Sequence, residues 1–372
     1  MTAEERPSSP VSCRSPTSDA TLIAELVAWY ALVKRDLPWR RRPRDAYAVW
    51  VSETMLQQTR VETVRPYYER FMRELPTVSA LADAPESHVL ALWSGLGYYR
   101  RARMLHAAAR HVVGVLGGRV PDEPAALRKL EGVGAYTAGA IASIAFGRRA
   151  ALVDGNVERV LARLFAIGDD VRSAQGKAGL WAIAERLVRA GTDDPGDWNQ
   201  ALMELGATLC AARDPHCHEC PVSDHCQAHA RGIVAALPLI RPKRAPRPMR
   251  RVVVVAASSR AILLARRCAG ALFGGLWEPP GTDGEVGSLV SRLALEVGEL
   301  VRAGSVVHVL SHRRMTVDVW RTALPKRRRW PPPSAEYDAI EAVALDDVGK
   351  LPHSSLTRKV LGVANVPVRG LR

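Results

Sequence analysis

The chain has 372 residues, enough for two domains of the usual size, and its 47% hydrophobic and 24% charged residues are typical of a globular protein. No apolar run approaches the ~20 residues that a membrane-spanning helix needs. The net charge of +14 favours a polyanionic partner, and nucleic acid before an acidic membrane surface, although arginine-rich codon usage can also produce such a surplus.

Residues 1–20 are rich in Ser, Pro and Thr and lack the apolar core of a signal peptide. We therefore expect a disordered tail and a cytoplasmic protein that does not enter membranes. Thiols stay reduced in that compartment, so clustered cysteines there favour metal ligation over disulfides.

Residues 21–228 are predicted to be helical, because apolar side chains recur at helical spacing and short turns with Pro or Gly separate the runs. No strand-like alternation of any length occurs in this part. The helical patterns cover residues 22–33, 61–71, 89–93, 101–116, 157–166, 179–188 and 198–209.

The composition changes at about residue 229. Residues 229–250 are predicted to be a basic linker, and residues 251–368 a smaller α+β domain. The domain has β-rich runs at 252–256, 261–265, 306–310 and 315–322, and a possible helix at 289–299. The basic stripe at the linker comprises Arg241, Lys243, Arg244, Arg247, Arg250 and Arg251.

Four cysteines lie within a short segment that directly follows a predicted helix. They are Cys210, Cys217, Cys220 and Cys226. Four thiolates in a compact loop can enclose a [4Fe–4S] cluster. Zinc also suits four thiolates, but zinc sites usually pair two closely spaced hooks, and only Cys217 with Cys220 forms one. Cys13 and Cys268 lie far away in sequence and are predicted to be plain thiols.

This cysteine spacing, at the end of a helical domain, resembles that of the endonuclease III superfamily of DNA glycosylases, and the resemblance extends over residues 21–228. It implies a helix-hairpin-helix core of two helical lobes with one [4Fe–4S] cluster per chain. It also implies a monomer that acts on double-stranded DNA, associated with the nucleoid of a bacterial-type cell.

The segment Leu-Glu-Gly-Val-Gly-Ala-Tyr-Thr-Ala at residues 130–138 resembles the superfamily's hairpin. Gly132 and Gly134 permit a tight turn with exposed N–H groups, and the next helix points its N-terminus at the same place, which suits a DNA phosphate. By sequence alone a generic turn between helices is the alternative. Glu131 stands where the family usually has Pro, and its charge should weaken a phosphate contact.

Two carboxylates are candidates for the chemistry. Asp154 precedes a helix, where it can be an N-cap or an anion that stabilises a developing cationic sugar, and the resemblance implies the catalytic role. Glu53 is the single charged residue between positions 46 and 59, which favours a protected site with the raised pKa of a general acid. The stretch 51–59 resembles the MutY-type adenine DNA glycosylases, in which this Glu protonates adenine N7.

Tyr136 occupies the position at which endonuclease III-type enzymes carry a Lys that attacks the sugar. A phenol cannot form the imine of that mechanism. We therefore expect a monofunctional glycosylase in which water is the nucleophile and the Tyr136 hydroxyl orients the Asp154 side of the site. The alternatives are a bifunctional glycosylase/lyase and a catalytically inert iron–sulfur protein that binds DNA or senses redox state.

Chemistry on a base within a duplex requires base flipping. By resemblance, Tyr98, after the glycines at positions 95 and 97, and Gln58 are the pair that wedges into the base stack. The resemblance also implies an adenine pocket lined by Arg35, Trp39, Arg40, Leu56 and Glu204.

The run Gly-Gly-Leu-Trp-Glu-Pro-Pro-Gly at residues 274–281 resembles the start of the family's Nudix-like domain. True Nudix hydrolases need a Glu-rich helix, and residues 288–299 supply only Glu296 and Glu299, so no hydrolysis by this domain is expected. The family recognises 8-oxoguanine through a Phe-Ser-His loop. Leu310, Ser311 and His312 stand there, so contacts from Ser311 and His312 are expected without the aromatic surface. A solvated β-turn is the alternative.

Overall fold

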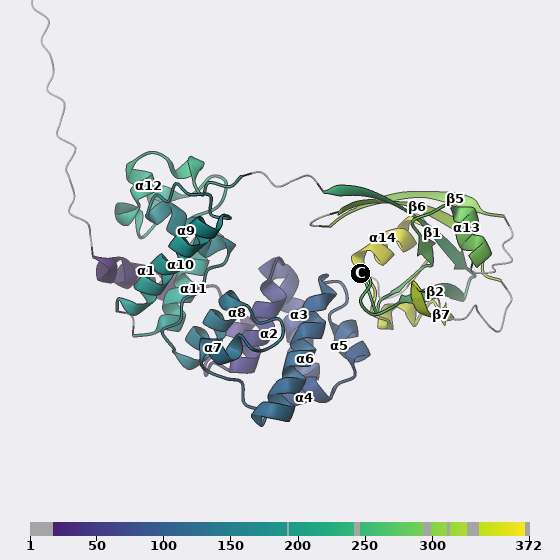
Figure 1. Cartoon of the computed structure of the whole chain (residues 1–372), viewed down its shortest axis with the longest axis horizontal. Coiled ribbons are helices and arrows are strands. Elements are labelled where there is room, and N and C mark those ends of the chain that lie inside the picture. Colours follow the sequence, from purple (N-terminus) through teal and green to yellow (C-terminus); the bar gives the residue numbers. More distant parts are fainter. Residues whose placement is uncertain are drawn as a thin grey trace, which may run out of the picture. The chain divides into compact units, whose positions relative to one another are not determined.

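A computed structural model describes residues 18–191, 193–241, 246–292, 299–310, 313–325 and 335–368. The chain divides into two compact units. The first comprises the described residues of Met1–Glu53 and Val120–Arg241, and the second those of Thr54–Arg119 and Pro242–Arg372. Figure 1 labels the main elements of both units. No described helix is both long enough and apolar enough to cross a bilayer.

All regular elements in the described residues of the first unit are helices, as the apolar spacing predicted. Helix α11 is its centre and contacts α1, α9 and the π-helical turn η2. It can do so because Trp198, Leu202 and Leu205 are buried at helical spacing. The elements are α1 (Asp19–Val33), η1 (Pro38–Arg40), α2 (Ala46–Leu56, which continues into the second unit), α7 (Pro124–Leu127), α8 (Ala135–Ala140), η2 (Ile141–Ala145), α9 (Gly155–Leu164), α10 (Ala174–Arg189), α11 (Pro195–Thr208), η3 (Cys217–Glu219), η4 (Ser223–His225), α12 (Gln227–Ala230) and η5 (Val234–Ala236).

The second unit begins with the end of α2 and four further helices: α3 (Val61–Glu74), α4 (Val78–Asp83), α5 (Glu86–Leu92) and α6 (Tyr99–Leu116). Helix α6 contacts α4 and α5. Its inner face is formed by Ala102, Leu105 and Ala109, all buried. Phe71 of α3 meets the ring of Trp93 edge-on, with the two centroids 6.0 Å apart.

The rest of the second unit is a mixed sheet with two main helices. The described strands are β1 (Arg247–Ala257), β2 (Ala261–Arg267), β3 (Trp277–Glu278), β4 (Gly281–Thr282), β5 (Val301–Val309), β6 (Arg313–Ala323) and β7 (Tyr337–Ala344). The strand order is β3-β2-β1-β6-β5, with β4 on β1 and β7 on β2. Strands β1 and β6 are parallel, and the other pairs are antiparallel. The four β-rich runs are confirmed as strands, whereas β3, β4 and β7 were not predicted.

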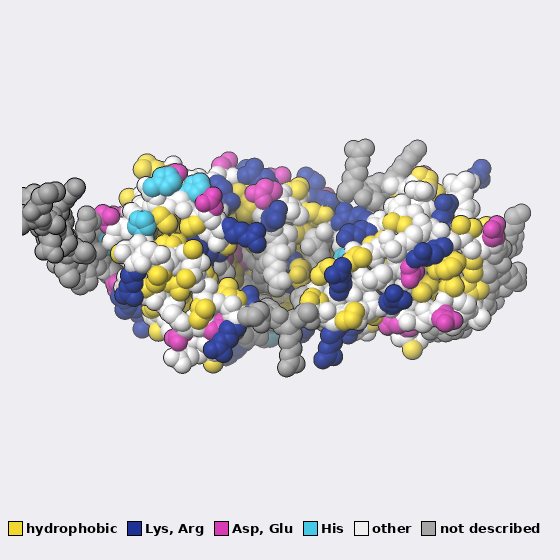
Figure 2. Space-filling model, turned by 90° about the horizontal axis from the view of Figure 1, so that it is seen from above, with side chains coloured by type: hydrophobic (Ala, Val, Ile, Leu, Met, Phe, Trp, Pro, Cys, Tyr) yellow, Lys and Arg dark blue, Asp and Glu magenta, His cyan; other side chains and the backbone are white. Residues whose placement is uncertain are grey.

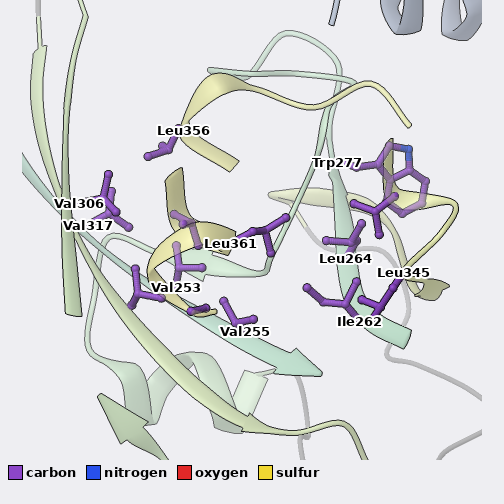
Figure 3. Packing of buried hydrophobic residues seen from close by; sticks show 14 of the residues in the cluster. Val253, Val255, Ile262, Leu264, Trp277, Val306, Val317, Leu345, Leu356 and Leu361 are labelled. Atoms are coloured by element: carbon purple, nitrogen blue, oxygen red, sulfur yellow. The ribbon is translucent and has the colours of Figure 1, made fainter. Parts of the chain in front are cut away.

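Each face of the sheet packs against one helix, because successive residues of a strand point to opposite faces. Val253 and Val255 of β1 join the cluster under α14 (Ser355–Val363), and Figure 3 shows them beside Leu361 of that helix. Val254 and Ala256 join the opposite cluster with Leu289 of α13 (Val286–Arg292). The short turn η6 (Val348–Lys350) precedes α14. The helix expected at 289–299 starts earlier, and its residues 293–298 lie outside the described residues.

The expected linker over residues 229–250 is partly wrong. Helix α12 ends at Ala230 and β1 already begins at Arg247. Arg251 does not belong to a solvated basic stripe, because its side chain is buried and pairs with Glu278 at 3.3 Å and Asp283 at 2.9 Å. A strand turns alternate side chains inward, and the carboxylates that pair with Arg251 are distant in sequence. Lys243 and Arg244 lie outside the described residues.

Candidate active site and cysteine loop

Helices α2 and α8 bring Glu53 and Tyr136 together in the first unit. The Tyr136 hydroxyl donates a hydrogen bond to Glu53 Oε2, and Met203 Sδ of α11 lies 3.4 Å from the same hydroxyl. The sequence led us to expect this hydroxyl to orient the Asp154 side of the site. The structure gives it a hydrogen bond to the other carboxylate instead. Met203 was not among the predicted site residues, and no charge or motif distinguishes it in the sequence.

Glu53 is only 5% exposed. Burial raises its pKa from 4.5 to about 7, because a charged carboxylate loses its hydration there. The Tyr136 hydrogen bond and the charge of Arg40 act in the opposite direction, whereas the charge of Asp154 raises the pKa further. A carboxyl with a pKa near neutrality can both donate and accept a proton under physiological conditions.

Asp154 is the N-cap of α9. Its Oδ1 accepts hydrogen bonds from the backbone N–H groups of Asn156 at 3.0 Å and Val157 at 2.7 Å, and its Oδ2 accepts one from Asn156 Nδ2 at 3.3 Å. Burial raises the pKa of Asp154, while the two backbone donors lower it. The same burial, together with the charges of Glu53 and Asp154, raises the pKa of Tyr136 well above its usual range. Three ionisable groups thus share one protected region.

The predicted hairpin joins α7 to α8. Gly132 has φ 77°, which lies in the left-handed region that glycine adopts without strain, and Gly134 is the N-cap of α8. Both glycines and Glu131 are exposed, whereas Val133 is buried beneath them. The first N–H groups of a helix have no partner within it, so this turn offers donors to an anion in solvent.

Three of the predicted adenine-pocket residues of the first unit form an ion cluster around a buried carboxylate. Glu204 is fully buried, and it accepts hydrogen bonds from Arg35 Nε at 2.6 Å and Arg40 Nη2 at 2.7 Å. Burial opposes ionisation of this carboxyl, but the two guanidinium groups outweigh burial and lower the pKa of Glu204. Trp39 is buried on η1, and Leu56 is half-buried at the end of α2.

The proposed wedging pair lies in the second unit. Gln58 has φ 57° and Tyr98 has φ 51°, and both side chains are exposed. Ser311 and His312 lie outside the described residues. Leu310, which precedes them, is partly buried and packs against the cluster under α14.

All four clustered cysteines are free thiols, and they line one cavity together with apolar side chains that include Leu164, Leu205 and Val222. In the described part of the chain, no three His, Cys, Asp or Glu side chains are arranged to hold a single metal ion. Four thiols on one apolar cavity are nevertheless the donor set of an iron–sulfur cluster, so the residues fit that group.

Two arginines of α9 donate hydrogen bonds to the cysteine loop. Arg159 Nε donates to the Cys210 carbonyl at 2.8 Å. Arg163, which is 2% exposed, donates to the Ala211 carbonyl at 2.7 Å and approaches Cys210 Sγ at 3.4 Å. Neither arginine was among the predicted site residues. Their separation of four residues, which places them on one helix face, was the available signal.

Comparisons with known proteins agree with this architecture. Residues 51–186 match the HhH-GPD superfamily base excision DNA repair protein family, and residues 251–362 match the NUDIX domain. The structure of a thermostable thymine-DNA glycosylase is similar, with 31% identity and a TM-score of 0.52 over 57% of this chain and 97% of that one. The fold and site therefore define a helix-hairpin-helix DNA N-glycosylase of base excision repair with a C-terminal Nudix-like domain.

Relatives that align with most of the chain identify the family more closely. The adenine DNA glycosylase of Rattus norvegicus is 42% identical over 86% of this chain and 73% of its own length. That of Homo sapiens is 39% identical over 87% of this chain and 72% of its own. The chain belongs to the adenine DNA glycosylase family.

The raised pKa of Glu53 predicts that this carboxyl destabilises the fold as pH rises. Below pH 4.5 both states are protonated, and between 4.5 and 7 the unfolded state alone ionises, so stability is lost up to the folded pKa of about 7. Replacing Glu53 by Gln removes this titration. We expect the variant to gain about 2 kcal/mol over the parent between pH 5 and pH 8.

Urea unfolding of both proteins at several pH values measures this difference. Glu62→Gln, which removes an exposed carboxylate of α3, is the control. A stability difference between the Glu53→Gln variant and the parent that stays constant with pH would show that Glu53 ionises normally in the folded protein.

Proposed function

We propose that this glycosylase removes adenine that lies opposite 8-oxoguanine or guanine in duplex DNA, by base flipping and hydrolysis of the N-glycosidic bond without strand cleavage. The observation that carries the proposal is the buried Glu53 carboxyl, with a pKa of about 7, hydrogen-bonded to Tyr136. Membership of the adenine DNA glycosylase family supports the choice of base.

In the proposed mechanism Glu53 is the general acid. Adenine is a poor leaving group because the departing nitrogen takes both bonding electrons, and a proton on N7 accepts that charge. A carboxyl with a pKa of about 7 is protonated in a large fraction of molecules at neutral pH, whereas an ordinary glutamate is not. The hydrogen bond from Tyr136 fixes the Oε2 side of the carboxyl.

Asp154 is the proposed stabilising anion. As the glycosidic bond breaks, positive charge develops on the sugar, and a fixed carboxylate nearby lowers the energy of that state. The two backbone N–H donors of α9 hold Asp154 in one orientation, so no reorganisation is needed when charge develops. Capping and catalysis are thus performed by one set of contacts.

Tyr136 supports hydrolysis rather than a lyase reaction. Its hydroxyl donates to Glu53, and its pKa is raised well above the usual range, so it stays neutral and is no nucleophile. Water then attacks the sugar. A lyase of this superfamily would need an amine where Tyr136 stands.

The ion cluster of Arg35, Arg40 and Glu204, together with Trp39 and Leu56, is proposed to line the adenine pocket. The paired guanidinium groups keep Glu204 ionised and fixed, which is the condition for directional hydrogen bonds to a base. Each of the three charged side chains is paired with another, so the ion cluster can remain ordered in the absence of a base.

DNA is proposed to be held at the hairpin through the backbone of Gly132 and Gly134 and opened by Tyr98 and Gln58. Figure 2 shows Lys and Arg side chains spread over the visible face, in keeping with the net charge of +14. Binding through phosphate contacts of this kind weakens as salt rises. Ser311 and His312 of the Nudix-like domain are the proposed contacts to 8-oxoguanine.

The four cysteines are proposed to hold one [4Fe–4S] cluster. The support is the set of four free thiols on one apolar cavity, with the Arg163 guanidinium beside Cys210 to offset thiolate charge. Such a cluster fixes the loop that it closes and offers one-electron redox chemistry. No step of base removal passes through it.

Glu53→Gln should lower the single-turnover rate of adenine release by about 10²-fold to 10⁴-fold, because the amide keeps the shape of the site but cannot supply the proton. The substrate is a duplex with adenine opposite 8-oxoguanine. Glu62→Gln should release adenine at the parental rate, and retention of parental activity by Glu53→Gln would mean that another group is the acid.

Borohydride trapping should yield no covalent enzyme–DNA adduct, because Tyr136 cannot form an imine. A bifunctional endonuclease III-type enzyme is the positive control. An adduct at a yield similar to that of the control would establish the glycosylase/lyase alternative for this chain.

Cys217→Ser should lose bound iron and acid-labile sulfide together with the visible absorption of the purified protein. Cys268→Ser, which removes a cysteine far from the loop in sequence, should retain all three. Metal analysis of the parent protein distinguishes an iron–sulfur cluster from a zinc site. Four iron atoms per chain would support the cluster, whereas one zinc atom per chain would contradict it and indicate a mononuclear zinc site.

A further inference from the structure

Two residues of the second unit adopt a backbone conformation that side chains seldom adopt. Gln58 follows α2 and Tyr98 caps α6, with φ angles of 57° and 51°. A non-glycine residue in this conformation is strained and persists only where surrounding contacts enforce it. In the proposed function both residues enter the base stack. The contacts that hold Gln58 and Tyr98 in these conformations therefore also determine where their side chains meet the DNA.

Arg101 of α6 reaches the segment that leads to Gln58. Its Nη1 donates to the carbonyl oxygens of Thr54 at 2.9 Å, Met55 at 3.1 Å and Gln57. The last carbonyls of a helix have no partner within it and carry the negative end of its dipole. The buried Arg101 guanidinium thus satisfies the carbonyl groups at the C-terminal end of α2, immediately before Gln58.

The same guanidinium reaches the segment that carries Tyr98. Its Nη2 lies 3.3 Å from Thr59 Oγ1 and 3.5 Å from the Gly97 carbonyl oxygen. Its central carbon lies 5.1 Å from the centroid of the Tyr98 ring, within the range of a cation–π contact. Tyr98 remains 49% exposed, so a ring supported by Arg101 can still meet DNA.

The surroundings of Arg101 are unusual for a buried arginine. The side chain is 9% exposed, and burial lowers its pKa to about 10, so it remains charged at neutral pH. Among the described residues no carboxylate contributes to its electrostatics, and its Nε has no hydrogen-bond partner. Its contacts are carbonyl oxygens, one hydroxyl and aromatic rings. None of these groups carries a full negative charge, so the contacts fix the positions of the neighbouring segments without neutralising the guanidinium.

We propose that Arg101 is a positioning residue that fixes Gln58 and Tyr98 in the geometry required to open the base pair. The inference rests on the proposed wedging role of that pair and names the group that holds it. A planar guanidinium can engage both segments and support a ring at once, whereas the single ammonium of a lysine cannot.

The test measures base opening separately from bond cleavage. A duplex carries 2-aminopurine in place of the target adenine, opposite 8-oxoguanine, and its fluorescence rises when the base leaves the stack. The variants are Arg101→Lys, which keeps the charge, and Arg101→Met. Arg110→Met is the matched control, because Arg110 lies on the same helix and donates to a single carbonyl, that of Ala82, at 3.2 Å.

We expect Arg101→Lys and Arg101→Met to lose most of the fluorescence rise. Their single-turnover adenine release should fall by up to about 10²-fold, the effect of a misplacement of about 1 Å. The pH midpoint of the rate should stay that of the parent, because the acid is untouched. Arg110→Met should open the base normally. If the Arg101→Met variant does not fold, the result for Arg101→Lys alone tests the positioning role.

A mutant cycle with the Tyr98→Ala/Gln58→Ala variant separates the two proposals. If Arg101 acts through this pair, adding Arg101→Lys to that variant should lower base opening no further. Losses that multiply, or normal opening by Arg101→Lys, would overturn the positioning role while leaving the wedge intact. Normal opening by the Tyr98→Ala/Gln58→Ala variant would remove the wedge itself and the inference with it.

Discussion

The candidate site depends on one interaction, the hydrogen bond from the partly buried Tyr136 hydroxyl to the buried Glu53 carboxyl. Burial alone would make Glu53 a weak acid held in its protonated form, whereas the hydrogen bond favours the carboxylate. The balance leaves the pKa at about 7, where one group can deliver a proton and recover it. In the proposed mechanism, a phenol instead of an amine at position 136 therefore affects both proton transfer and the identity of the final nucleophile.

The fold brings the groups that set the Glu53 pKa together from elements that are distant in sequence. Helix α2 carries Glu53, the hairpin before α8 positions Tyr136, and the N-terminus of α9 holds Asp154 through two backbone donors. Helix α9 also fastens the cysteine loop through Arg159 and Arg163. One helix thus orders a candidate catalytic carboxylate at its start and the candidate cluster loop along its length.

Much of this could be predicted from the sequence, because the signals are local. Apolar spacing gave the helices, and the uncharged neighbours of Glu53 indicated the burial and raised pKa that the structure has. The buried arginines could not be predicted in this way. Patterns place Arg in solvent, yet Arg101, Arg163 and Arg251 are buried because carbonyls or carboxylates distant in sequence meet them. The bonding partner of Tyr136 depends on the same long-range packing.

The most direct test of the account is the pH dependence of single-turnover adenine release by the parent and by Tyr136→Phe. The parental rate should fall as pH rises through about 7, since Glu53 must be protonated to act. Loss of the phenol removes a contact that lowers the Glu53 pKa, so the midpoint should move to higher pH in Tyr136→Phe. A parental midpoint near the ordinary glutamate value of 4.5, or a midpoint that the substitution leaves unchanged, would contradict the account.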